Sequence, residues 1–385
     1  MDLKVNRKRI LEEFEELISI DSLSLQERGM ADVLIRKLEA LGCRTEEDGA
    51  AAKIGGSCGN LLAYLPGTFP EGTPEAELPP ILLAAHMDTV IPGTGKTAVR
   101  KDGHICAGEG AVLGADDVSG IAEILEGIRI LQEQDIPHRP AEILFTASEE
   151  NYCRGSHAFD ASKLQSEDAY IMDLAGPVGS AAVRAPSLIW FSVTVRGRAA
   201  HAGFCPEQGI HAVQAAAKAI ARLPQGRLDE ETTFNFGRIE GGRVSNIVPD
   251  CCTVIGEVRS YSHERALEVI EEMTAVFEEE AARIGASAEI DPKEAIHAYR
   301  IDENESVCRR FLAALETAGI PSADGEEVFV STFGGSDNNV LSQRGIRGIV
   351  PTSGMYEPHS LQEYTTEEDL VQGARLIAAL CMQTI

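Results

Sequence analysis

A ten-residue stretch, Ile81–Val90 (ILLAAHMDTV), constrains the fold more than any other part of the chain. Its first five residues are apolar, which predicts a strand that is buried on both faces, as in a parallel sheet covered by helices. In open α/β sheets, ligands bind beyond the carboxyl ends of the strands. His86 and Asp88 end this run two residues apart, so both side chains are expected to point the same way at the mouth of a sheet. An imidazole beside a carboxylate is typical of a metal ligand and its orienting partner, although a surface ion pair uses the same residue types.

Further acidic and histidine side chains directly follow other apolar runs. They are Glu149 and Glu150 after residues 141–147, Asp173 after residues 169–172, and His359 in the loop after residues 348–350. The segment 114–120 (GADDVSG) opens a predicted helix with Asp116 and Asp117 at its start, where acidic residues also occur simply as caps. A doubly wound sheet would bring all these groups to one edge.

Helices and strands alternate around these runs. Helices are predicted over residues 6–20, 26–41, 118–134 and 366–382, a strand over 60–65, and irregular segments over 66–80 and 92–110. This order predicts an α/β domain built on a mixed sheet.

The segment between residues 187 and 297 has a different order of predicted strands and helices. Strands are predicted over 188–195, 232–239, 251–259 and from 286, and helices over 209–223 and 263–284. The order β-α-β-β-α-β is the ferredoxin-like pattern. We therefore expect a larger domain in two parts, residues 1–186 and 298–385, with an independent small domain inserted at 187–297.

Composition limits the classes of binding partner and the cellular compartment that the sequence is compatible with. The formal net charge of −27 argues against nucleic acid and anionic membranes as partners. Nine cysteines without CxxC spacing indicate reduced thiols in the cytoplasm. The N-terminus reads as an amphipathic helix rather than a signal peptide, and no apolar stretch reaches the length of a membrane span.

The candidate ligands suit two metal ions better than one. Two histidines and several carboxylates are the donors that Zn²⁺ takes in proteins. A shared aspartate would hold two such ions roughly 3.5–4 Å apart, as in two-metal hydrolases. A carboxylate that is not a ligand must then take a proton from water, and the pair Glu149-Glu150 can supply both a ligand and this base.

Taken together, these motifs resemble the M20 family of co-catalytic zinc peptidases, and within it the peptidase T group. The matching segments fall in family order and span nearly the whole chain: HMDTV at 86–90, LGADDVSG at 113–120, SEE at 148–150, MD at 172–173, RAAHAG at 198–203, SNIVPD at 245–250, FGGSDNN at 333–339 and PHS at 358–360.

The resemblance implies a role for each matching residue. One metal would be bound by His86, Asp116 and Asp173, and the other by Asp116, Glu150 and His359. Asp88 would orient His86, and Glu149 would be the general acid/base. An aspartate at 173, rather than a glutamate, fits the aminopeptidase-like members.

Other implied roles concern substrate. His201, which as a lone histidine reads as a loop surface residue, would polarise the scissile carbonyl, in its own subunit or in a partner's. Substrate contacts would come from Asn246, Arg259, Gly334 and Gly335. Val118 departs from the lysine that is common at its position in peptidase T relatives. Six further histidines match no motif and are predicted to be structural: His104, His138, His157, His211, His263 and His297.

The resemblance thus implies a cytoplasmic di-zinc exopeptidase that cuts the N-terminal residue from short peptides, with residues 187–297 as a lid or dimerisation domain. Co²⁺ or Mn²⁺ could replace Zn²⁺, and a homodimer through the inserted domain is expected. The alternatives are an amidohydrolase on N-acyl amino acids, a carboxypeptidase with the same metals, and a non-catalytic binding protein on the same fold.

Overall fold

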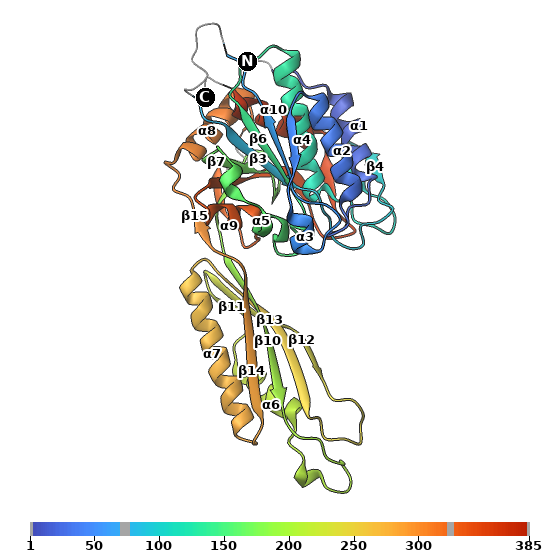
Figure 1. Ribbon diagram of the computed structural model, residues 1–385, viewed down its shortest axis with the longest axis vertical. Helices are drawn as coiled ribbons and strands as arrows, with labels where there is room; N and C mark the ends of the chain where they lie inside the picture. The colour runs from blue at the N-terminus through green and yellow to red at the C-terminus, as the bar shows by residue number, and fades with distance from the viewer. Residues whose placement is uncertain (1–2, 70–77, 322–326, 383–385) are drawn as a thin grey trace. The chain divides into compact units, whose positions relative to one another are not determined.

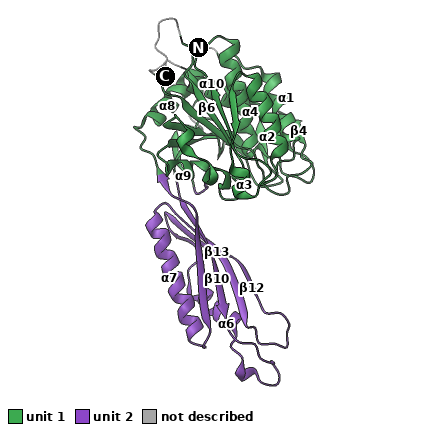
Figure 2. Cartoon of the chain, viewed as in Figure 1, with its two compact units in different colours: residues 1–184, 300–332, 336–385 green, residues 185–299, 333–335 purple. Residues whose placement is uncertain are grey.

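The computed structural model describes residues 3–69, 78–321 and 327–382, which form two compact units. Unit 1 comprises residues 1–184, 300–332 and 336–385, and unit 2 comprises residues 185–299 and 333–335 (Figure 2). Each unit has its own hydrophobic core. No helix within the described residues combines the length and apolar character needed to cross a bilayer.

Unit 1 is built on a mixed sheet whose central strands run parallel. The strand order is β1-β2-β6-β3-β7-β17-β18-β5-β4. The central strands β6 (Ala141–Thr146), β3 (Ile81–His86), β7 (Asp168–Ile171) and β17 (Arg347–Tyr356) are parallel neighbours. Every residue of β3 and β6 is buried, as their continuous apolar sequences predict.

Helices cover this sheet (Figure 1). The longer ones are α1 (Arg7–Ile18), α2 (Arg28–Ala40), α4 (Ala115–Glu133), α8 (Ser306–Ala318) and α10 (Glu367–Cys381). The short ones are α3 (Ala50–Ile54), α5 (Arg154–Ala158) and α9 (Asp337–Ser342). Asn6 caps α1, and Gly42, in a left-handed conformation, follows α2, so both predicted helices have the expected ends.

Shorter strands complete the sheet of unit 1. They are β1 (Arg44–Glu47), β2 (Leu61–Leu65), β4 (Ala98–Lys101), β5 (His104–Ala107), β8 (Leu174–Ala175), β9 (Ala181–Ala185), β15 (Tyr299–Arg300), β16 (Phe329–Ser331) and β18 (Tyr364–Thr366). Of the loop expected at 66–80, residues 70–77 lie outside the described residues.

Two expectations for unit 1 are wrong. The segment 92–110 is not irregular throughout, because β4 and β5 pair there as an antiparallel hairpin. Asp102 and Gly103, both at positive φ, make its turn, and this Asp-Gly pair is a recognised hairpin signal. The strand expected at 348–350 extends to Tyr356, because residues 352–356 pair in turn with β8 and β18.

Unit 2 has the ferredoxin-like architecture predicted for the inserted segment. Its antiparallel sheet has the order β11-β12-β13-β10-β14. The strands are β10 (Ser187–Arg196), β11 (Gly226–Asp229), β12 (Thr232–Gly241), β13 (Cys251–Ser260) and β14 (Ser287–Ile296). Helices α6 (Ala212–Arg222) and α7 (His263–Ala282) pack on the sheet. The short edge strand β11 was not expected.

Candidate metal centre

The parallel strands of unit 1 deliver the predicted ligands to one edge. His86 is the last residue of β3, Glu149 and Glu150 follow β6, and Asp173 follows β7. Asp116 lies in the first turn of α4, where its backbone dihedral angles are not helical. His359 lies between β17 and β18 at a φ of 62°. Segments more than 200 residues apart in sequence therefore meet here, since His359 Nε2 lies 2.9 Å from Glu150 Oε1.

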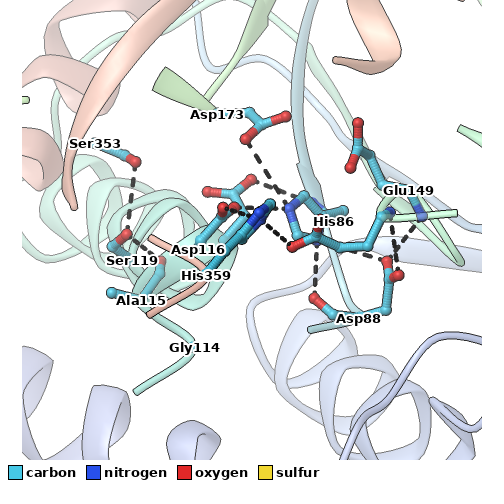
Figure 3. A network of polar contacts seen from close by, with 12 residues as sticks. His86, Asp88, Gly114, Ala115, Asp116, Ser119, Glu149, Asp173, Ser353 and His359 are labelled. Atoms are coloured by element: carbon cyan, nitrogen blue, oxygen red, sulfur yellow. Dashed lines mark hydrogen bonds and ion pairs between the residues drawn. The ribbon is translucent and has the colours of Figure 1, made fainter. Parts of the chain in front are cut away.

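The ligand atoms form two overlapping groups, His86 with Asp116 and Asp173, and Asp116 with Glu150 and His359. In the first, His86 Nε2 lies 2.9 Å from Asp116 Oδ1 and 3.9 Å from Asp173 Oδ1 (Figure 3). In the second, His359 Nε2 lies 3.1 Å from Asp116 Oδ2. One carboxylate thus presents a different oxygen to each group, which is the arrangement a bridging ligand requires.

Asp88 acts mainly on the turn that carries the two glutamates. Its carboxylate accepts hydrogen bonds from the backbone N–H of Glu149 at 2.8 Å and of Glu150 at 3.2 Å, and from the hydroxyl of Ser24 at 2.6 Å. His86 Nδ1 lies 2.9 Å from the backbone oxygen of Asp88 and 3.5 Å from its carboxylate. A proton on Nδ1 donated to that carbonyl leaves Nε2 free as the ligand atom.

Buried carboxylates outnumber the cationic groups of this cluster. Burial, followed by the charge of Asp116, raises the pKa of Asp173, and burial with the charge of Asp173 raises the pKa of Glu149. Asp116 differs, because hydrogen bonds from His359 and His86 outweigh the effect of burial and lower its pKa. The hydrogen bonds of His359 to Asp116 and then to Glu150 raise the pKa of His359 to about 11. Divalent cations at these atoms would offset the carboxylate repulsion, and the donor set of imidazole and carboxylate suits them.

The two groups differ in access to solvent. The His86 side chain is 2% exposed, whereas that of His359 is 52% exposed. A cavity of about 350 Å³ borders Glu150, and its lining combines the apolar residues Leu23, Val90 and Ile91 with polar side chains. The cluster is therefore anchored in the core on one side and open to small molecules on the other.

The sequence analysis missed two supporting residues, Glu363 and Cys153, and did not predict the contact that Asp117 makes. The Glu363 carboxylate is 1% exposed and accepts the backbone N–H of Gly114 at 2.7 Å and of Asp116 at 3.1 Å. Asp117 accepts the backbone N–H of His86 at 3.2 Å. The thiol of Cys153 donates to Glu149 Oε1 at 3.2 Å. Only the spacing of Glu363, four residues after His359, could have drawn attention to it.

The remaining predicted site residues belong to unit 2. His201 is exposed, and its Nδ1 accepts the backbone N–H groups of Gly203 and Phe204, both at 3.1 Å. The Arg259 guanidinium pairs with Glu257 and donates to the carbonyl of Phe333 at 2.8 Å. Gly334 and Gly335 follow that residue, and Asn246 is exposed in the loop before β13.

Family models of two peptidase domains match the chain. The M20 peptidase dimerisation domain matches residues 184–285. The model of peptidase family M28 matches residues 65–188, which include His86, Asp116 and Glu149.

Relatives match over almost the full length. The uncharacterized protein YqjE of Bacillus subtilis is 36% identical, over 98% of this chain and 98% of its own. The crystal structure of aminopeptidase PepT from Bacillus cereus is 35% identical, with a TM-score of 0.88 over 98% of both chains. That of a tripeptidase from Staphylococcus aureus is 31% identical, with a TM-score of 0.91 over 98% of both chains. With this fold, these ligand groups and these relatives, the chain belongs to the M20 family of metallopeptidases, alongside its peptidase T-type members.

Proposed function

We propose that this metallopeptidase is a two-zinc exopeptidase that removes the N-terminal residue from short peptides. The observation that carries the proposal is the position of Asp116, whose two carboxylate oxygens face His86 at 2.9 Å and His359 at 3.1 Å. A bridging carboxylate of this kind is what a two-metal hydrolase needs. The similar structures named aminopeptidase PepT and tripeptidase support the choice of substrate.

The residues that would hold the ions are His86, Asp116 and Asp173 for one and Asp116, Glu150 and His359 for the other. Zn²⁺ fits imidazole and carboxylate donors, and Co²⁺ or Mn²⁺ could replace it. When bound, two such ions supply the positive charge that acidifies water and polarises a peptide carbonyl.

Glu149 would move the proton. It follows β6 beside the ligand Glu150, and Asp88 fixes the backbone N–H of both residues. Its pKa is raised, chiefly by burial and then by Asp173, which favours a carboxylate able to accept a proton from water and return it to the leaving amine.

His201 would steady the charge on the carbonyl oxygen. Because its Nδ1 accepts two backbone N–H groups, the neutral ring carries its proton on Nε2. An exposed Nε2–H is a suitable donor to an oxyanion, in this subunit or from a partner. The peptide would be held by Asn246, Arg259, Gly334 and Gly335. Arg259 would contribute indirectly, because its guanidinium donates a hydrogen bond to the carbonyl of Phe333, which directly precedes the two glycines.

Assembly and compartment are part of the proposal. We propose a homodimer through the inserted domain, supported by the match of the dimerisation model to residues 184–285 and by β11 and β14 at the edges of its sheet. A cytoplasmic site of action is supported by nine free cysteines, all within the described residues.

The central test exchanges Glu149 for glutamine. Glu149→Gln is expected to abolish turnover of a tripeptide while the protein keeps its two bound metals, because glutamine cannot accept the proton and Glu149 is not a ligand. Turnover and metal content by mass spectrometry are measured on the same preparation. Loss of metal together with activity would show that the role assigned to Glu149 is wrong.

A substrate panel tests the specificity. The stripped enzyme is reloaded with Zn²⁺, Co²⁺ or Mn²⁺ and assayed on a tripeptide, a dipeptide and an N-acetyl amino acid. We expect cleavage of the tripeptide after its first residue. Preference for the N-acetyl amino acid, or release of the last residue, would favour the amidohydrolase or the carboxypeptidase instead.

A further inference from the structure

A second cluster of metal-binding side chains lies within unit 2. His263, Glu294 and His297 place one nitrogen or carboxylate oxygen each within 4.8 Å of one another. His297 Nδ1 lies 2.8 Å from Glu294 Oε1, and His263 Nε2 lies 3.7 Å from Glu294 Oε2. The carboxylate therefore turns one oxygen to each ring. None of these residues belongs to the catalytic cluster.

Two elements that pack together supply the three ligands. His263 is the first residue of α7, after the capping residue Ser262, while Glu294 lies near the end of β14 and His297 just beyond it. In Figure 1, α7 and β14 lie side by side. The side chains of His263, His297 and Glu294 are 18%, 32% and 47% exposed, so an ion could enter from solvent.

A buried hydroxyl orients the first histidine. Ser187 is 0% exposed, and its Oγ accepts the backbone N–H of Ala298 at 2.8 Å. The same oxygen lies 3.0 Å from His263 Nδ1. When Nδ1–H donates to this oxygen, the lone pair of Nε2 faces Glu294. Metal-binding histidines commonly have their second nitrogen held in this way.

We propose that His263, Glu294 and His297 bind one divalent transition metal ion, such as Zn²⁺, separate from the catalytic pair. Two histidines and a glutamate leave a fourth position for water, as in other zinc sites with these donors. Ligand atoms about 2.1 Å from one ion lie at most about 4.2 Å apart, and the three ligand atoms here already lie within 4.8 Å of one another. The centroids of the two imidazole rings are 4.1 Å apart at an interplanar angle of 29°, and the more exposed His297 ring can rotate to adjust its position on the ion.

Such an ion would cross-link the end of unit 2 where the chain enters the unit and where it leaves. Unit 2 begins at Ala185 and its main segment ends at Tyr299, two residues from Ser187 and His297 respectively. The ion would tie the first turn of α7 to the end of β14, with Ser187 joining the start of β10. We expect it to make this end of the unit more rigid rather than to take part in peptide cleavage.

The test counts metal ions in matched variants of the full-length protein. Wild type, Glu294→Gln and Glu289→Gln are stripped with chelator, dialysed against the same micromolar free Zn²⁺ and analysed by mass spectrometry. Glu289 is an exposed glutamate on the same strand, 74% exposed, and serves as the control. We expect Glu294→Gln to bind one Zn²⁺ fewer per chain than the other two. Equal metal content in all three would overturn the proposal and leave only an ion pair between Glu294 and His297.

Ser187→Ala tests the orienting contact without removing a ligand. Loss of a group that orients a metal-binding histidine typically weakens metal affinity on the order of 10–100-fold. We expect this loss at the unit 2 ion alone, in competition with a chromophoric chelator, and an unchanged affinity would contradict the proposed geometry. Peptidase activity at saturating Zn²⁺ is expected to be equal in all variants. If every protein, wild type included, were inactive, the proposed function would be wrong. The number of bound metal ions would still test the unit 2 site independently.

Discussion

At the scale of single residues, one carboxylate joins the two halves of the candidate metal centre. Glu363 lies four residues after His359, and it accepts the N–H groups of Gly114 and Asp116 some 250 positions earlier in the chain. It thereby fixes the turn that holds Asp116 to the loop that holds His359. Gly114 precedes α4 at a φ of 78°, which allows this turn to form.

Glu363→Gln is therefore expected to weaken metal binding, because an amide has one acceptor oxygen and an NH₂ group that cannot accept from an N–H donor. We expect a loss on the order of 10–100-fold in affinity, as for other groups that orient metal ligands. Titration with a competing chelator measures it. Glu368→Gln, the same exchange at a side chain 54% exposed, is the control and should bind metal like wild type. Equal affinity of both variants would show that Glu363 has no positioning role.

The sequence predicted which side chains would meet but not what holds them. His86, Asp116, Glu149, Glu150, Asp173 and His359 could be found because each follows an apolar run or opens a helix, and because together they match a family. Glu363 and Cys153 could not, because Glu363 binds backbone N–H groups and Cys153 binds one oxygen of Glu149. Such contacts depend on the three-dimensional path of loops, which leaves no periodic pattern in a sequence.

At the scale of elements, the long periodic segments were predicted well and the short ones poorly. The predicted helix at 6–20 is α1, and the strand at 251–259 is β13, with ends that differ by a residue or two. By contrast, β4 and β5 have four residues each and few buried side chains, so they show no alternation of apolar and polar residues. The Asp-Gly turn between them was the only sequence feature that indicated a hairpin. Tertiary pairing, rather than local sequence, extends β17 past Val350.

The close crossing of α4 and α10 provides a test at this scale. A Cβ atom on Gly127 would lie 2.4 Å from Ile377 Cγ2 and 2.7 Å from its Cβ, and Ile377 is fully buried. Gly127→Ala is therefore expected to destabilise the protein by about 1–3 kcal/mol, as overpacking of a core does, although alanine favours helices. Chemical denaturation measures the change.

Gly29→Ala is the matched control. Gly29 lies in α2, where a Cβ atom would meet only Ile20 Cγ2, at an ordinary 3.5 Å. This variant is expected to gain about 0.4–1 kcal/mol, because alanine restricts the unfolded chain. If both variants were equally stable, α4 and α10 would not be packed as closely as the structure indicates.

At the scale of the whole molecule, two cores predict two unfolding events. The core of unit 1 and that of unit 2 share no residues, and the candidate catalytic ligands all lie in unit 1. A protein with separate cores commonly departs from two-state unfolding. We therefore expect two calorimetric transitions, which hydrogen exchange of β3 and β13 amides can assign to their units.

Metal removal should act on these transitions selectively. An ion present at 100 times its Kd stabilises the folded state by about 2.7 kcal/mol, so chelation lowers the transition of any unit that holds an ion. In Glu294→Gln, which lacks the proposed unit 2 ion, chelator should lower the transition of unit 1 alone. In wild type it should lower both. If chelator lowered only the transition of unit 2, no ion at Asp116 would stabilise unit 1. The unfolding experiment would then contradict the proposal that Asp116 bridges two metal ions.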